Sequence, residues 1–142
     1  MMEMIDSGIR LQALLLADHA NVREGLLNVL SAGITRANLG QYPGNLAAYL
    51  VLVVYLPADQ VGLEHEAEIV IKYPETAREA GKIGITFRPD GERNPGEGLY
   101  VPLIVPTLAI VFPEPGQVDI QVSLDRQPAN DLTIWLIPPD PV

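Results

Sequence analysis

Apolar and polar residues alternate with a period of two along several segments of this chain. In the clearest segment, one set of alternating positions holds His65, Ala67, Ile69, Ile71 and Tyr73. The other set holds glutamates and a lysine, with Val70 as the one apolar exception. The segments Ile83 to Arg88 and Val118 to Leu124 repeat the pattern. A period of two is typical of strands in an antiparallel sheet with one face towards water.

Other apolar runs are continuous, and they predict strands in different environments. Leu46 to Leu56 is apolar on both faces, which favours a central strand or one covered by a loop. Leu99 to Phe112 contains Pro102 and Pro106, and each proline removes a hydrogen-bond donor from a sheet. We expect this run to be an edge strand, to be broken, or to cross between sheets. Further strands are expected at Ile9 to Asp18, Leu26 to Ala32, Ile34 to Ala37 and Leu132 to Ile137.

Two segments have a spacing that also suits a helix. Pro74 to Gly81 has a proline at its start, alanines inside and a glycine at its end, which predicts a short helix. Asn21 to Leu30 has apolar residues at helical spacing, but Gly25 and the β-branched Val29 favour a turn followed by a strand. A helix is the alternative prediction for Asn21 to Leu30.

Short strands separated by turns predict an all-β fold. The 13 prolines and 12 glycines fall in clusters between the apolar runs, as turn residues do. We expect an antiparallel β-sandwich, immunoglobulin-like or C2-like, of about seven to nine strands with one short helix. A small barrel is the alternative. The length suits a single domain over residues 1–142, with 1–8 and 138–142 as flexible tails.

Composition argues against several classes of function. The chain has no cysteine, which excludes a disulfide scaffold, a thiolate metal site and a cysteine nucleophile. Its net charge of −9 argues against binding to nucleic acid or to an anionic membrane surface. The N-terminus lacks the basic segment of a secretory signal, and the longest apolar run is too short to cross a bilayer. We therefore expect an acidic, cytoplasmic protein.

Two segments carry a family resemblance. The first, Ala17 to Ile34, reads A-D-H-A-N-V-R-E-G-L-L-N-V-L-S-A-G-I. It resembles the opening of a family of small uncharacterised bacterial proteins, frequent in actinobacteria, with A-D-x-A followed by G-x-x-N-V-x-x-G-G. Ala32 stands where many members have glycine. The second, Pro115 to Asp125, resembles the proline-glycine turn and strand near that family's end. The resemblance implies a compact β-rich domain of unknown function, without a known activity or catalytic residue.

The sequence lacks the common motifs of catalysis and nucleotide binding. None of its three serines lies in a G-x-S-x-G nucleophile elbow, and no glycine-rich phosphate-binding motif occurs. Basic residues do not cluster, and only 6% of residues are aromatic, which argues against an RNA-binding platform. The two histidines lie in separate segments. We expect no catalytic residue, cofactor or resident metal, and hence no enzyme.

Three kinds of acidic segment could carry chemistry: an Asp–His pair, a row of glutamates and two acidic loops. Asp18 and His19 are neighbours, but neighbouring side chains on a strand point to opposite faces. We expect Asp18 to be structural, accepting backbone N–H groups of the turn that follows it. The glutamates of Glu64 to Glu68 form a row that a cation could bridge, although a solvated sheet face explains the row better. Acidic loops near residues 88–97 and 125–131 also contain arginines, which would compete with a cation.

Counting apolar faces predicts self-association. Leu46 to Leu56 is apolar on both faces and Leu132 to Ile137 nearly so, yet each layer of a sandwich has only one inner face. Outward apolar side chains would form a contact surface, and a two-fold homodimer is the commonest way to cover one. The candidates for this surface are Tyr49, Val51, Val53, Tyr55 and Trp135. The loops Pro57 to Leu63 and Pro74 to Lys82 are the alternative cover.

These observations favour a non-catalytic binding module that self-associates or binds a protein partner. Two alternatives stay open. One is a small-ligand-binding protein or enzyme whose pocket the sequence does not reveal, and a concave site of converging polar residues would favour it. The other is a structural subunit of a larger assembly, which ring or filament packing would favour.

Overall fold

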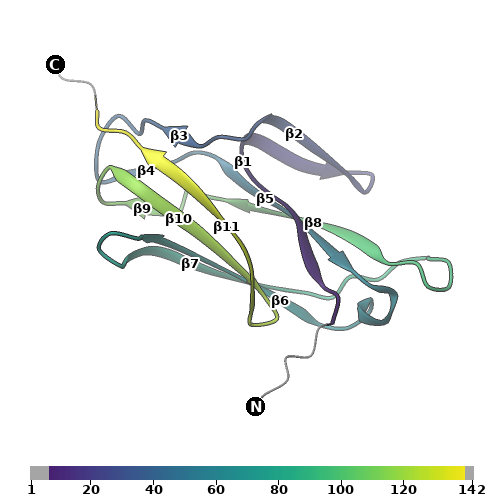
Figure 1. Cartoon of the computed structure of the whole chain (residues 1–142). Helices are drawn as coiled ribbons and strands as arrows, with labels where there is room; N and C mark the ends of the chain where they lie inside the picture. Colours follow the sequence, from purple (N-terminus) through teal and green to yellow (C-terminus); the bar gives the residue numbers. More distant parts are fainter. Residues whose placement is uncertain (1–6, 140–142) are drawn as a thin grey trace, which may run out of the picture.

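Two β-sheets stacked face to face form the body of the molecule (Figure 1). The computed structural model describes residues 7–139. Sheet A has the strand order β2 (Leu26–Ala32), β1 (Arg10–Arg23), β5 (Tyr49–Leu56) and β8 (Leu99–Pro106). Sheet B has the order β3 (Arg36–Ala37), β11 (Gln127–Leu136), β10 (Gly116–Leu124), β6 (His65–Tyr73) and β7 (Arg78–Phe87). A small third sheet pairs β4 (Gly44–Asn45) with β9 (Val111–Phe112).

The architecture confirms the expected all-β sandwich. Among the described residues, every strand pairing is antiparallel except the short one between β3 and β11. Eight of the strands have seven residues or more, and the other three have two each. The helical content of residues 7–139 is one turn of 3-10 helix, Ala58–Gln60. The tails expected at 1–8 and 138–142 fall largely outside the described part of the chain.

The core lies between the two sheets and follows the alternation in the sequence. On β5, Leu50 and Leu52 point inwards, and on β6 Ile69 and Ile71 do the same from the opposite sheet. On β6 each of the five positions of the His65 set is buried, and the glutamates between them are not. Because the inner faces are largely apolar, burial of these side chains holds the sheets together.

Two ambiguous segments are both β-hairpins. The short helix predicted over Pro74 to Gly81 is wrong. Residues 74–77 form a turn, and β7 starts at Arg78, which pairs with Tyr73. The ladder with β6 satisfies the backbone along a whole strand, which one or two helical turns could not do. For Asn21 to Leu30 the turn and strand are confirmed, but the turn is only Glu24–Gly25, with φ of 54° and 74°.

The two long apolar runs occupy the places that their sequences suggest. β5 lies inside sheet A between β1 and β8, as expected for a strand that is apolar on both faces. β8 is an edge strand and contains both prolines, and the run is broken after Pro106 before β9 begins. These positions leave the second face of β5 on the outside of sheet A.

Candidate interaction surface

The outer face of sheet B is polar. Along β6 and β10, the register brings Glu68 beside Ser123 and Lys72 beside Asp119. Glu68 also lies 3.8 Å from the Lys82 ammonium, and Thr133 donates a hydrogen bond of 3.0 Å to Asp119. Charged and hydroxyl groups on this face interact with one another and with water, as on an ordinary solvated sheet.

The outer face of sheet A is apolar instead. The register places these side chains on it, around β5: Ala13, Leu15, Ala17, Tyr49, Val51, Val53, Tyr55, Tyr100, Pro102, Ile104 and Pro106. A charged residue, Arg10, also lies on this face. Its guanidinium carbon is 4.4 Å from the centre of the Tyr55 ring. Sheet A therefore presents apolar side chains on both of its faces.

Part of this outer face is covered by the chain itself. Val51, a predicted contact residue, is 0% exposed, so its assignment as an accessible contact is wrong. It forms a small buried cluster with Ala17 and Ala20, against which Leu27 and Ile104 pack. Leu27 belongs to β2, so the cover comes from the β1–β2 hairpin rather than from the loops Pro57 to Leu63 or Pro74 to Lys82.

The other predicted contact residues do not form one surface. Tyr49, Val53 and Tyr55 lie together on sheet A and are half-buried. Trp135 is on β11 in sheet B, where it is 51% exposed and pairs with Gln117 and Arg36. Its outward direction was predicted correctly, since Ile134 and Leu136 on either side are in the core. Around it lies a shallow hollow formed with Thr35, Arg36 and Ile137.

The most exposed apolar side chains are on the β1–β2 hairpin, which the prediction missed. Leu26 is 69% and Leu30 61% exposed, and Val22 and Val29 are also exposed. In Figure 1 the hairpin ends in a free tip at the side of sheet A. A signal for this surface is present in the sequence, because the seven residues of β2 are mostly apolar and include no charged side chain.

The prediction that Asp18 belongs to a turn is wrong. β1 continues as a strand to Arg23, so Asp18 lies within the strand, well before the turn at Glu24–Gly25. Its side chain is exposed and makes no hydrogen bond to any of the described residues. His19 points to the outer face instead, where its ring meets the Tyr49 ring edge-on at 5.4 Å.

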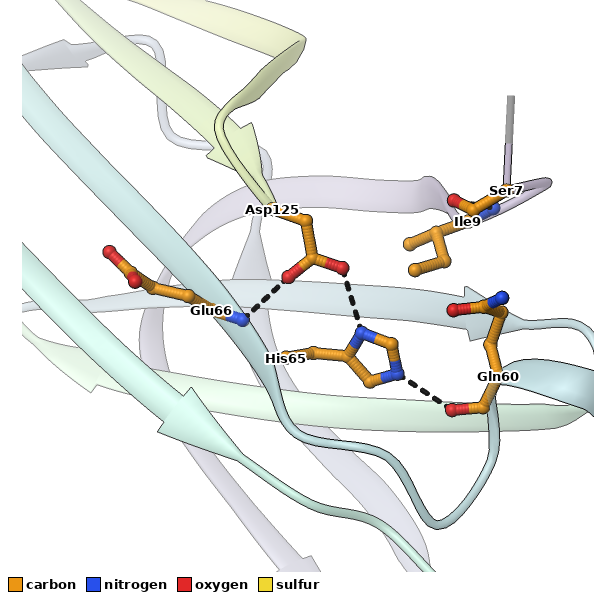
Figure 2. Close-up of polar contacts among 6 residues, drawn as sticks. All are labelled: Ser7, Ile9, Gln60, His65, Glu66 and Asp125. Carbon is orange, nitrogen blue, oxygen red and sulfur yellow. Dashed lines mark hydrogen bonds and ion pairs between the residues drawn. The ribbon is translucent and has the colours of Figure 1, made fainter. Parts of the chain in front are cut away.

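The other histidine is buried and lies at the centre of a polar cluster (Figure 2). His65 is 4% exposed, and its Nδ1 lies 2.8 Å from Asp125 Oδ2. Its Nε2 lies 2.6 Å from the backbone carbonyl oxygen of Gln60. The second oxygen of Asp125 accepts a hydrogen bond of 2.8 Å from the backbone N–H of Glu66. The histidine thus joins the 3-10 turn, the start of β6 and the β10–β11 turn.

This cluster resembles a catalytic Asp–His pair only in part. A general base needs one ring nitrogen directed at a substrate or nucleophile, whereas both nitrogens of His65 face protein oxygens. A ring that carries hydrogens on both nitrogens donates to both oxygens, while a neutral ring donates to one. The arrangement is suited to holding three segments together. Asp125 comes from 60 residues further along the chain, so sequence spacing did not reveal the pair.

Residues 7–139 contain neither a cluster of metal-binding side chains nor a helix that could span a membrane. Within residues 7–139, no three histidine, aspartate or glutamate side chains gather closely enough to hold a metal ion. The row of glutamates on β6 is part of the solvated face of sheet B. No helix in the described part of the chain has the length and apolar character needed to span a bilayer.

Comparison with known proteins identifies the family. A model of a family of unknown function, DUF6941, matches residues 12–136. The chain belongs to the DUF6941 family. This confirms the resemblance to an uncharacterised small-domain family, and membership adds no activity.

No curated protein matches the chain. A similar solved structure is the Pseudomonas fluorescens alkylpurine DNA glycosylase AlkC, bound to DNA containing an abasic site analogue. The identity is 11% and the TM-score 0.49, over 92% of this chain and 30% of the glycosylase. The chain thus spans less than a third of that enzyme, and a likeness at this level carries no functional argument.

Proposed function

We propose that this DUF6941 domain is a non-catalytic interaction module that self-associates through the apolar surface of sheet A. We define this surface as the exposed apolar side chains of the β1–β2 hairpin and the adjoining outer face of β1, β5 and β8. The observation that carries the proposal is the location of the exposed apolar residues. Of the ten exposed large apolar side chains among the described residues, five lie on β1 and β2: Leu15, Val22, Leu26, Val29 and Leu30. The other five are spread over separate elements.

Charge supports the choice of sheet A over sheet B. Each copy of the chain carries a net charge of −9, so two copies repel unless they meet where charge is sparse. Acidic side chains line the outer face of sheet B, whereas Arg10 alone is charged among the register neighbours of β5 on sheet A. Covering one apolar patch with its own copy removes it from water on both partners.

Light scattering on the purified chain at micromolar concentrations tests the proposal. We expect twice the monomer mass of 15.4 kDa. Leu26→Asp places a charge on the most exposed part of the hairpin and should give the monomer mass. Trp135→Asp, an equally drastic change at an exposed position of sheet B, is the matched control and should leave the dimer intact. A wild-type chain that stays monomeric, or a dimer lost only with Trp135→Asp, would refute the proposal.

A further inference from the structure

We infer that two copies of this chain join through the free edge of β2, so that the two A sheets form one continuous sheet across a two-fold axis. The inference rests on the proposed self-association and specifies its geometry. β2 is the last strand of sheet A, and no described strand pairs with its outer edge. Figure 1 shows this edge at the periphery of the molecule.

The backbone groups at the free edge follow from the hairpin register. Arg23 pairs with Leu26 across the two-residue turn, and Asn21 pairs with Asn28. In such a hairpin the residues flanking the turn form a hydrogen-bonded pair, and the pairs alternate from there. Leu26 and Asn28 therefore bond to β1. Leu27 and Val29 direct their N–H and C=O groups to the open side, where a further strand can bond to them.

The other sheet edges carry features that oppose strand addition, and β2 does not. β8 contains two prolines, β3 has only two residues, and β7 carries charged side chains at Arg78, Glu79 and Lys82. Short length, proline and charge are the usual means of protecting an edge. β2 is mostly apolar, with no proline and no charged residue. Its first deviation from extended backbone is at Ser31, with φ of 54°, beyond the part needed for pairing.

The sequence of the edge fits a second copy of itself. Residues 26–30 read L-L-N-V-L, which is close to symmetric about Asn28. Antiparallel pairing centred on Asn28 sets Leu26 opposite Leu30 of the second copy and Leu27 opposite its Val29. Apolar residues then meet on both faces of the joined sheet, and such cross-strand pairs stabilise a sheet. In this register, the N–H and C=O groups of Leu27 bond to those of Val29 in the second copy. These are the backbone groups that face the open side.

Charge permits this contact between two acidic chains. The charged residues closest to the edge are Glu24 at the hairpin tip and, one strand away on β1, Arg23 and Asp18. In the register centred on Asn28, the tip of one copy lies beside residues 32–33 of the other, which are Ala32 and Gly33. The tip brings no net charge to the other copy, because Arg23 and Glu24 offset each other. A two-fold axis also makes the contact self-limiting, because each β2 has one free edge and a dimer uses both.

Sedimentation velocity with an edge variant and a face variant tests the inference. Val29→Pro removes an N–H that faces the open side, and it leaves the ladder to β1 in place. It removes two symmetric hydrogen bonds from the dimer, so the dissociation constant should rise about 30-fold. Trp135→Asp changes the outer face of sheet B, away from the edge and from the surface of sheet A, and it should leave the dimer intact.

Amide hydrogen exchange of the wild-type chain gives an answer that does not depend on any variant folding. The amides of Leu27 and Val29 should exchange rapidly when dilute and become protected as the concentration rises. A dimer that survives Val29→Pro, or whose Leu27 and Val29 amides exchange freely, overturns the edge geometry and leaves the proposed self-association standing. A chain that is monomeric throughout overturns both.

Discussion

The outer faces of sheets A and B hold equivalent places in the sandwich, yet their side chains differ in kind. On sheet B, Glu68 and Asp119 lie among lysine, serine and threonine partners. On sheet A, Val51 and Val53 lie between Leu15, Ala13, Ile104 and Pro102. The polar outer face of sheet B can stay in contact with water in a monomer. Sheet A covers part of its second face with its own hairpin and leaves the hairpin exposed.

The difference shows how a small sandwich can carry a strand that is apolar on both faces. β5 is the strand concerned, and its neighbour β1 forms with β2 the hairpin that packs over Val51. Covering one apolar surface with a two-stranded hairpin creates another, because a hairpin has two faces and an edge of its own. An exposed apolar hairpin is therefore a consequence of how Val51 is buried.

The largest expected loss of stability comes from a valine-to-aspartate substitution on sheet A, compared with the same substitution on the outer face of sheet B. Val51→Asp places a carboxylate without a partner inside the buried cluster, and it should lower the free energy of unfolding by about 3–5 kcal/mol. Val70→Asp sits on the outer face of sheet B opposite Lys82, and it should cost about 1 kcal/mol through weaker strand propensity. Urea denaturation measures both. Equal losses at the two positions would remove the distinction between the faces.

A smaller loss of stability is expected from removing the Asp125 carboxylate, which accepts hydrogen bonds at the end of sheet B. Asp125→Ala removes the acceptor of both the His65 ring and the Glu66 backbone N–H, and it should destabilise the chain by about 2 kcal/mol. Asp131→Ala, at an exposed position of the neighbouring strand, should change stability by less than about 0.5 kcal/mol. Asp125→Asn keeps one acceptor and should fall between the two. Thermal unfolding in one buffer ranks the three variants.

Tyr73, on the inner side of sheet B, should make the stability of the chain fall at alkaline pH. Tyr73 donates a hydrogen bond of 2.6 Å to the backbone carbonyl of Glu114, and burial raises its pKa above the usual value of 10.0. The folded chain then keeps this proton at a pH where the unfolded chain loses it. The stabilisation is therefore complete below pH 10 and is lost as pH rises through the folded pKa.

Tyr73→Phe tests this account. The variant should lose about 1 kcal/mol at neutral pH, because the Glu114 carbonyl loses its donor. It should also show a shallower fall in stability at alkaline pH than the wild type. Tyr100→Phe, at an exposed position of sheet A, is the control for the neutral-pH loss. An unchanged alkaline profile in Tyr73→Phe would contradict the assignment.

The smallest effects should come from the isolated charges of the two outer faces. Arg10→Ala removes the guanidinium over the Tyr55 ring, and it should cost about 0.5 kcal/mol. Lys82→Ala breaks the exposed contact with Glu68, and it should cost no more than about 0.5 kcal/mol, falling further in high salt. A double-mutant cycle of Arg10→Ala with Tyr55→Leu isolates the first interaction. No coupling between the two changes would contradict it.

Local pattern was a good guide to the strands and a poor guide to the contact surface. The alternation in β6 and β10, the prolines of β8 and the outward direction of Trp135 were all predicted from neighbouring residues. The hairpin at Pro74 to Gly81 was not, and a short helix was predicted in its place, because a segment of that length suits either until its partner strand is known. Asp18 was misplaced for a related reason, since β1 continues past the point where its apolar run ends.

The sequence by itself determined which residues face the core, since a period of two sorts each strand into an inner and an outer set. It also determined that apolar outer positions exceed what a two-layer sandwich can bury. Tertiary structure decided which of those positions are covered. Val51 is buried in a cluster against which Leu27 packs, Trp135 lies on the other sheet, and His65 meets Asp125 across 60 residues. These outcomes depend on strand order and on the bend of a hairpin, which arise from contacts between segments far apart in the chain.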